Sequence, residues 1–263
     1  MFFASNDRYR YARSPLIEVI CQLRFPAILS IGAKEPAQFQ EAIRRDFPRY
    51  AVKTEQAPVK VVGAGTPNAR VEPQAPVTNY HFISADGFWK INLTSTFIAL
   101  STLRYTRWED FAHALDKPLA QFIQIYEPAF FERVGLRYIN AFSRKVLGLE
   151  GTPWADLIQP AFLGPLAESD LEESTVSRCS LDLEMKPEEN VRLKLHAGPG
   201  LLQGGKQDSE VKFILDSDLS CNGSFSPERI PERLECFHGY ATRILRGALT
   251  SQLHTAMGPF PLD

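Results

Sequence analysis

The segment LRYTRWEDF, residues 103–111, places two arginines beside two aromatic residues. Arg104, Tyr105, Arg107 and Trp108 have the side chains that stack on bases and hold phosphates. The same residues also suit the start of a helix. Trp108 would then lie in the core, Glu109 and Asp110 would lie near the positive end of the helix dipole, and Arg104 would face solvent. Both interpretations stay open on the sequence alone.

A second unusual segment is FERVGLRYINAF, residues 131–142, which has the composition of a buried strand but carries Arg137 and Asn140. An arginine that leaves water is costly unless a carboxylate or a carbonyl pairs with it. We therefore expect Arg24 and Arg137 at an open sheet face or at a seam between two halves of the protein, with partners such as Glu18, Asp86 or Asp182. The tentative ligand-binding site that this predicts consists of Arg24, Arg104, Tyr105, Arg107, Arg137 and Asn140.

Motifs for metal binding and covalent catalysis are missing from the sequence. The five histidines do not recur at helical spacing, and neither H-E-x-x-H nor C-x-x-C occurs. There is no G-x-S-x-G motif, and Cys21 and Cys179 lie in expected strands as inert thiols. We predict no catalytic residue, no metal and no cofactor, and we interpret His238 as a hydrogen-bonded structural group.

Two weaker patterns have ordinary structural explanations. The segment HAGPGLLQGGK, residues 196–206, approaches a phosphate-binding loop, but Gln207 stands where that motif needs Ser or Thr. It lies between two expected antiparallel strands, which favours a hairpin loop. The acidic residues at 182 and 184 and at 216 and 218 recur at period two, which is typical of a solvated sheet face.

The composition indicates an ordinary globular protein. The 263 residues are 44% hydrophobic and 23% charged, and the formal net charge of −2 gives no overall basic excess. The first residues lack the apolar region of a signal peptide, and no apolar run approaches the ~18 residues that span a bilayer. We expect a cytoplasmic protein with reduced cysteines and no membrane partner.

Apolar periodicity predicts an α+β fold with a mainly antiparallel sheet and helices packed on one face. Residues 51–76 look like a long exposed loop. Pro118 is expected to kink or split the helix that contains it. Expected strands cover 15–26, 77–106 (three strands), 131–142, 174–185, 190–198 and 210–220, and expected helices cover 35–48, 107–128, 152–163 and 226–253.

The order of these elements repeats. Residues 1–128 and 129–263 each give a strand, a short helix, antiparallel strands and a long helix, so we predict a duplicated α+β unit with the second half packed on the first. The order across 15–142 is also ferredoxin-like. The two leading strands would then lie side by side.

Three long segments resemble an uncharacterised bacterial family of sporadically distributed proteins. They are PLIEVICQLRFP (15–26), FISADGFWKINLTSTFIALSTLRYTRWEDF (82–111) and FFERVGLRYIN (130–140). The resemblance covers most of the first 145 residues. It implies a bacterial protein of an accessory or defence-related locus, and it supplies no catalytic residues.

Two functional hypotheses follow. The first is a non-enzymatic binding or adaptor module with a protein partner. The alternative is an RNA- or nucleotide-binding or processing protein that uses the Arg/Tyr/Asn seam. The sequence does not indicate the oligomeric state.

Overall fold

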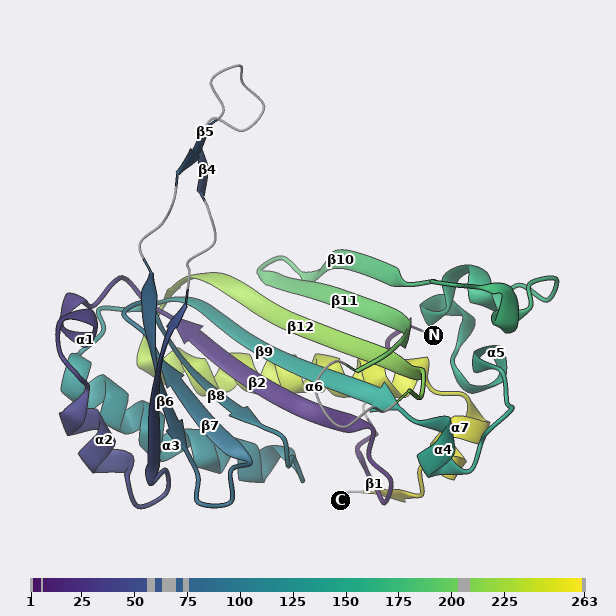
Figure 1. Cartoon of the computed structure of the whole chain (residues 1–263), viewed down its shortest axis with the longest axis horizontal. Helices are drawn as coiled ribbons and strands as arrows, with labels where there is room; N and C mark the ends of the chain where they lie inside the picture. The colour runs from purple at the N-terminus through teal and green to yellow at the C-terminus, as the bar shows by residue number, and fades with distance from the viewer. Residues whose placement is uncertain are drawn as a thin grey trace.

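The computed structural model describes residues 2–5, 7–55, 60–62, 70–72, 76–202 and 209–261. A nine-stranded sheet with the order β10-β11-β12-β9-β2-β8-β7-β6-β3 runs through this part of the chain, and every neighbouring pair in it is antiparallel. The fold is therefore α+β with a mostly antiparallel sheet (Figure 1). The sheet strands are β2 (Leu16–Arg24), β3 (Arg49–Glu55), β6 (Val77–Ile83), β7 (Trp89–Leu93), β8 (Phe97–Thr102), β9 (Phe131–Phe142), β10 (Leu181–Glu188), β11 (Val191–Gly200) and β12 (Lys212–Phe225).

The two long helices lie against the same face of the sheet, behind it in Figure 1. Helix α3 follows the first group of strands and α6 the second. The helices are α1 (Leu29–Ala33), α2 (Ala37–Ile43), α3 (Trp108–Tyr126), α4 (Arg144–Leu147), α5 (Trp154–Leu157), α6 (Ile230–Ala248) and α7 (Ser251–Ala256), with 3-10 turns at 160–162, 164–167, 173–175 and 227–229.

The centre of the sheet is the pair formed by β2 and β9. Ile20 lies opposite Arg137, and Arg24 lies opposite Arg133. On either side of this pair, β2 is hydrogen-bonded to β8, the last strand of the meander β6-β7-β8, and β9 is hydrogen-bonded to β12, the last strand of the meander β10-β11-β12. β2 and β9 are therefore adjacent at the centre of the sheet, as the sequence predicts, and they run antiparallel to each other.

The apolar spacing explains why these elements form and pack. In α3 the buried residues include Trp108, Phe111, Leu115 and Phe122, which recur every three, four and seven residues along one side of the helix. In β10 half-buried and exposed residues alternate along the whole strand, which is the pattern of a sheet with one solvated face. The core therefore lies between the sheet and its two long helices.

Four expectations about the elements are wrong in their detail. Residues 51–55, assigned above to a loop, belong to β3, which pairs with β6 along the sheet edge. Pro118 does not split its helix, since α3 continues through it. Residues 152–163 form one α-helical turn and a 3-10 turn, and β10 begins at Leu181 instead of near residue 174.

The described residues do not include the parts of the expected loop at 56–59, 63–69 and 73–75. Between them, β4 (Lys60–Val62) pairs with β5 (Arg70–Glu72) and stands away from the main sheet (Figure 1). Another two-stranded sheet joins distant parts of the chain, because β1 (Tyr9–Tyr11) pairs with β13 (Pro259–Pro261). This pairing fixes the N-terminal segment beside the cavity described next.

Candidate functional site

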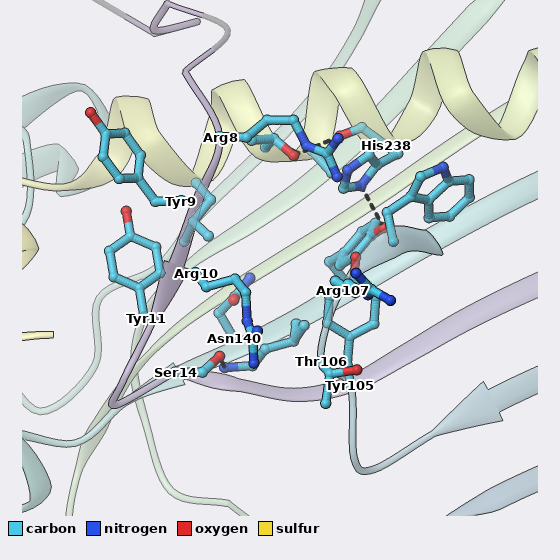
Figure 2. Close-up of a pocket in the computed structure, with 16 residues that line it drawn as sticks. Arg8, Tyr9, Arg10, Tyr11, Ser14, Tyr105, Thr106, Arg107, Asn140 and His238 are labelled. Atoms are coloured by element: carbon cyan, nitrogen blue, oxygen red, sulfur yellow. Dashed lines mark hydrogen bonds between the residues drawn. The ribbon is translucent and has the colours of Figure 1, made fainter. Parts of the chain in front are cut away.

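A cavity of about 180 Å³ lies on the helix-covered side of β9. Its walls come from the N-terminal segment, from the connection between β8 and α3, from β9 and from α6 (Figure 2). The lining includes residues 8–11, residues 105–108, two side chains of β9 and one face of α6. Four segments that are far apart in the sequence therefore converge on one small space.

Strand and helix periodicity explain which side chains reach the cavity. Tyr138 and Asn140 are two residues apart in β9, so both project from the same face of the strand. On α6, His238, Ala241 and Leu245 follow each other at spacings of three and four, so they share one side of the helix. The site is therefore built on rigid elements on two of its sides.

Side chains of the N-terminal segment, residues 8–11, also alternate between two sides of the backbone. Figure 2 shows the Arg8 and Arg10 side chains extending to one side of the segment and Tyr9 and Tyr11 to the other. The hydroxyl of Tyr11 lies 3.0 Å from Nδ1 of His254 in α7, and the ring of Tyr9 packs edge-on against the same histidine. The two tyrosines anchor the segment, and the two arginines extend toward the cavity.

A buried tyrosine–histidine pair forms the back of the cavity. The Tyr138 hydroxyl and Nδ1 of His238 lie 2.9 Å apart, and the His238 ring stacks on Trp108 with ring centroids 4.7 Å apart. Burial, with help from the positive charge of Arg8, lowers the pKa of His238 from 6.5 to about 4. The imidazole is therefore neutral at pH 7, and His238 is the hydrogen-bonded group that the sequence predicts.

Burial also suppresses ionisation of the phenols. The pKa of Tyr138 lies well above its usual value because the side chain is desolvated, and the nearby Tyr105 phenol raises it further. The pKa of Tyr105 is raised by burial as well. The aromatic wall is therefore uncharged at physiological pH, and its rings offer apolar faces with hydroxyl groups that donate or accept hydrogen bonds.

Two buried polar atoms of the lining residues have no hydrogen-bond partner in the part of the chain that the structure describes. They are Oδ1 of Asn140 and Nε2 of His238. Asn140 is only 3% exposed, and its Nδ2 is already occupied, since it donates to the carbonyl of Leu215 at 3.2 Å. His238 is 8% exposed. A buried polar atom without a partner costs about 1–3 kcal/mol, and both residues belong to the lining of the cavity.

Three arginines belong to the lining, and two of them are paired. Arg8 donates to Glu109 at 2.8 Å, and Arg107 donates to Asp110 at 2.9 Å. The hydrogen bond from Arg8 lowers the pKa of the Glu109 carboxyl. The carboxyl of Asp110 also has a lowered pKa, held first by the Thr106 hydroxyl and then by Arg107. Both carboxylates therefore stay ionised and keep their arginines in place.

The structure brings together half of the residues that the sequence predicts for the site. Tyr105, Arg107 and Asn140 line the cavity. Arg24, Arg104 and Arg137 do not, so the single seam of six residues is wrong as predicted.

Each of the other three arginines has a different environment. Arg104 lies over the Phe88 ring and pairs with Asp86 at 3.4 Å. Arg137 donates to both carboxylate oxygens of Asp216, at 2.8 and 2.5 Å, on the face of β9 opposite to Asn140. Arg24 is exposed at the end of β2. Arg137 therefore pairs with a carboxylate at the open sheet face as expected, but its partner is Asp216, and Asp86 pairs with Arg104 instead of Arg24 or Arg137.

Sequence reasoning missed Arg8, Arg10, Tyr138 and His238 as parts of one site. One signal was present, because the alternation of Arg and Tyr over residues 8–11 marks a short strand with a cationic side. Nothing in the sequence shows that this segment pairs with Pro259–Pro261, which is what places it at the cavity.

Neither a metal site nor a reactive cysteine forms a second candidate site in the described part of the chain. Across the described residues, no group of three or more His, Cys, Asp or Glu side chains could hold a metal ion. Burial raises the pKa of Cys21 to about 12, as expected for an inert core thiol. None of the described helices is long and apolar enough to cross a membrane.

Comparison with known proteins adds nothing to this picture, because neither a family model nor a curated protein sequence matches the chain. The family resemblance in the first half of the sequence therefore stays a prediction.

Proposed function

We propose that this protein is a non-enzymatic binding module and that its cavity binds a small polar ligand. The observation that carries the proposal is the pair of buried atoms, Asn140 Oδ1 and His238 Nε2, that lack partners in the described part of the chain. Ligand pockets are mostly apolar and present a few polar groups that fix the orientation of the ligand. The tyrosine and tryptophan walls with these two atoms fit that description.

The geometry supports a small ligand better than a strand of RNA. A seam for RNA would need the arginines on one surface, but Arg137 lies on the opposite face of β9 from Asn140 and is paired with Asp216. Arg133 on that same open face is paired with Asp218 at 3.2 Å. These charges are neutralised in pairs and leave little attraction for a phosphate backbone. The base of a free nucleotide could stack on Tyr105 in the cavity, with its sugar and phosphate outside.

A protein partner is a second candidate, supported by the edge strand β3. Tyr50 and Val52 are 40% and 45% exposed there, and β3 pairs on only one side in the described sheet. An exposed strand edge is where a partner chain can add a strand. Replacement of Val52 by Lys would abolish capture of such a partner and leave ligand binding in the cavity unchanged.

The proposal also includes the duplication of the chain and its cellular and genomic context. We infer a duplicated chain with halves 1–128 and 129–263, which the matching neighbours of β2 and β9 support. A ferredoxin-like first half stays a prediction. A cytoplasmic location and a bacterial accessory or defence-related locus rest on the sequence alone.

A ligand screen by thermal unfolding tests the binding function. A library of monocyclic polar compounds and nucleosides should contain members that raise the Tm of the wild-type protein, since a ligand that binds only the folded state stabilises it. Asn140→Leu should remove the shift, whereas Arg24→Gln, on the far side of the sheet, should retain it. If no compound shifts the Tm of the wild type, the cavity holds only water and the proposal is wrong.

A further inference from the structure

We propose that the ligand is a small organic anion, with one ring, a carboxylate and a hydrogen-bond donor, and that Arg10 binds its carboxylate. This inference rests on the proposed binding function and specifies the ligand class. It depends on three features of the same cavity: the charge of its lining, its size, and the polarity of the buried atoms in its walls.

The charge of the lining is positive. Of the 16 residues that line the cavity, three are arginines, Arg8, Arg10 and Arg107, and none is Asp or Glu. The carboxylates of Glu109 and Asp110 lie outside the lining, where Glu109 pairs with Arg8 and Asp110 with Arg107. Cations that face a cavity without acidic residues favour an anion.

Arg10 is the arginine that remains for a ligand. Within the described ranges, Arg8 and Arg107 form direct ion pairs, whereas the exposed Arg10 forms none and acts only at longer range on the Asp110 carboxylate, whose pKa it helps to lower. Figure 2 shows its side chain extending into the same hollow as Asn140. A guanidinium group binds a carboxylate through two parallel hydrogen bonds, which fixes the position of the carboxylate as well as its charge.

The size of the cavity limits the ligand. The volume of about 180 Å³ is slightly larger than that of an engineered apolar protein cavity of roughly 150 Å³, which binds benzene. One six-membered ring with a small substituent therefore fits inside. A complete nucleotide would have to leave its sugar and phosphate outside.

The polarity of the buried atoms indicates where the ligand must donate. Oδ1 of Asn140 is an amide oxygen and can only accept a hydrogen bond, and the amide nitrogen Nδ2 already donates to the Leu215 carbonyl. The ligand therefore needs a hydroxyl or N–H at its inner end. Tyr105 and Tyr138, whose rings lie 5.8 Å apart and edge to face, offer aromatic surface beside it.

The probe that combines these features is 4-hydroxybenzoate, and its neutral isostere is 4-hydroxybenzamide. Calorimetric titration of the full chain should give 4-hydroxybenzoate an affinity at least about 10-fold higher than that of the benzamide. Arg10→Gln should reduce the affinity for the benzoate about 10-fold and leave the benzamide unchanged. Arg24→Gln, an exposed arginine on the other face, is the matched control and should change neither value.

The possible outcomes separate this inference from the proposed function. If the benzamide binds as tightly as the benzoate, and Arg10→Gln has no effect, the ligand is not an anion held by Arg10, although the cavity still binds ligands. If uridine monophosphate binds and the single-ring anions do not, the size argument is wrong. If nothing binds and Asn140→Leu behaves as the wild type with every probe, the proposed function fails together with the inference.

Discussion

The Tyr138 hydroxyl and the His238 Nδ1 atom, 100 residues apart in the sequence, meet at 2.9 Å and connect the central strand β9 to helix α6. Both side chains are buried, and both also line the cavity. The same contact therefore stabilises the packing of α6 on the sheet and shapes the back of the proposed site. Because burial holds the His238 imidazole neutral, this histidine also makes the stability of the fold depend on pH.

The first prediction concerns that pH dependence. Since the pKa of His238 is lowered to about 4 in the folded state, the unfolded chain binds a proton below pH 6.5 that the folded chain does not. His238 therefore favours the folded state above pH 6.5, and this contribution is lost as the pH falls toward 4. Between pH 7 and 5 the loss should be about 2 kcal/mol.

Urea denaturation at several pH values measures this effect. His238→Gln should show a shallower loss of unfolding free energy between pH 7 and 5 than the wild type. Tyr138→Phe is the matched control, because it removes the hydroxyl but leaves the histidine, so the slope should persist. Equal slopes in the wild type and in His238→Gln would contradict the assignment of His238 as a buried neutral group.

The second prediction compares two strand glycines. A Cβ added at Gly198 would lie 2.5 Å from the backbone carbonyl oxygen of Cys179, in the segment that leads into β10, and a backbone atom cannot turn away as the end of a side chain can. A Cβ added at Gly135 would meet the end of the flexible Arg133 side chain instead. Gly198→Ala should therefore cost roughly 2 kcal/mol or more, and Gly135→Ala less than about 1 kcal/mol. Chemical denaturation of both variants checks the order, and a reversed order would be inconsistent with these contacts.

The third prediction concerns Arg144, which holds the segment after β9. It pairs with Glu173 at 2.9 Å, donates to the Thr152 carbonyl at 2.8 Å and lies over the Trp154 ring. Lysine cannot form this planar set of contacts, so Arg144→Lys should cost about 1 kcal/mol and Arg144→Ala about 2 kcal/mol. Limited proteolysis should cut residues 144–175 faster in both variants. Unchanged proteolysis would mean that other contacts hold the segment.

The fourth prediction separates the two faces of the sheet. The Arg137–Asp216 pair lies on the solvated face, where an ion pair contributes about 1 kcal/mol or less. Arg137→Gln should therefore change the unfolding free energy by no more than that, and it should not alter ligand binding in the cavity. A loss of binding in Arg137→Gln would restore the idea of a shared arginine seam.

The sequence was sufficient to exclude that seam. Arg137 and Asn140 are three residues apart in a strand, and side chains alternate between faces with a period of two, so the two residues had to face opposite sides. Asn140 could be identified from the sequence as an unusual residue in a buried strand. That its Oδ1 lacks a partner could not, because this depends on the pairing of β9 with Leu215 in β12.

Other differences between expectation and structure have local physical causes. β3 resembled a loop because an edge strand is solvated on more sides, and Lys53 and Thr54 are exposed there. Pro118 does not split α3, because buried side chains on both of its sides, including Leu115 and Phe122, hold the helix against the sheet. Such packing overrides local propensity, and a single sequence does not display it.

The most direct measurement is a crystal structure of the protein soaked with 4-hydroxybenzoate. We predict density for the ring in the cavity between β9 and α6, with a ligand oxygen within hydrogen-bond distance of Asn140 Oδ1 and the carboxylate at Arg10. A cavity that contains only ordered water, with the compound bound at the open sheet face or not at all, would contradict the account.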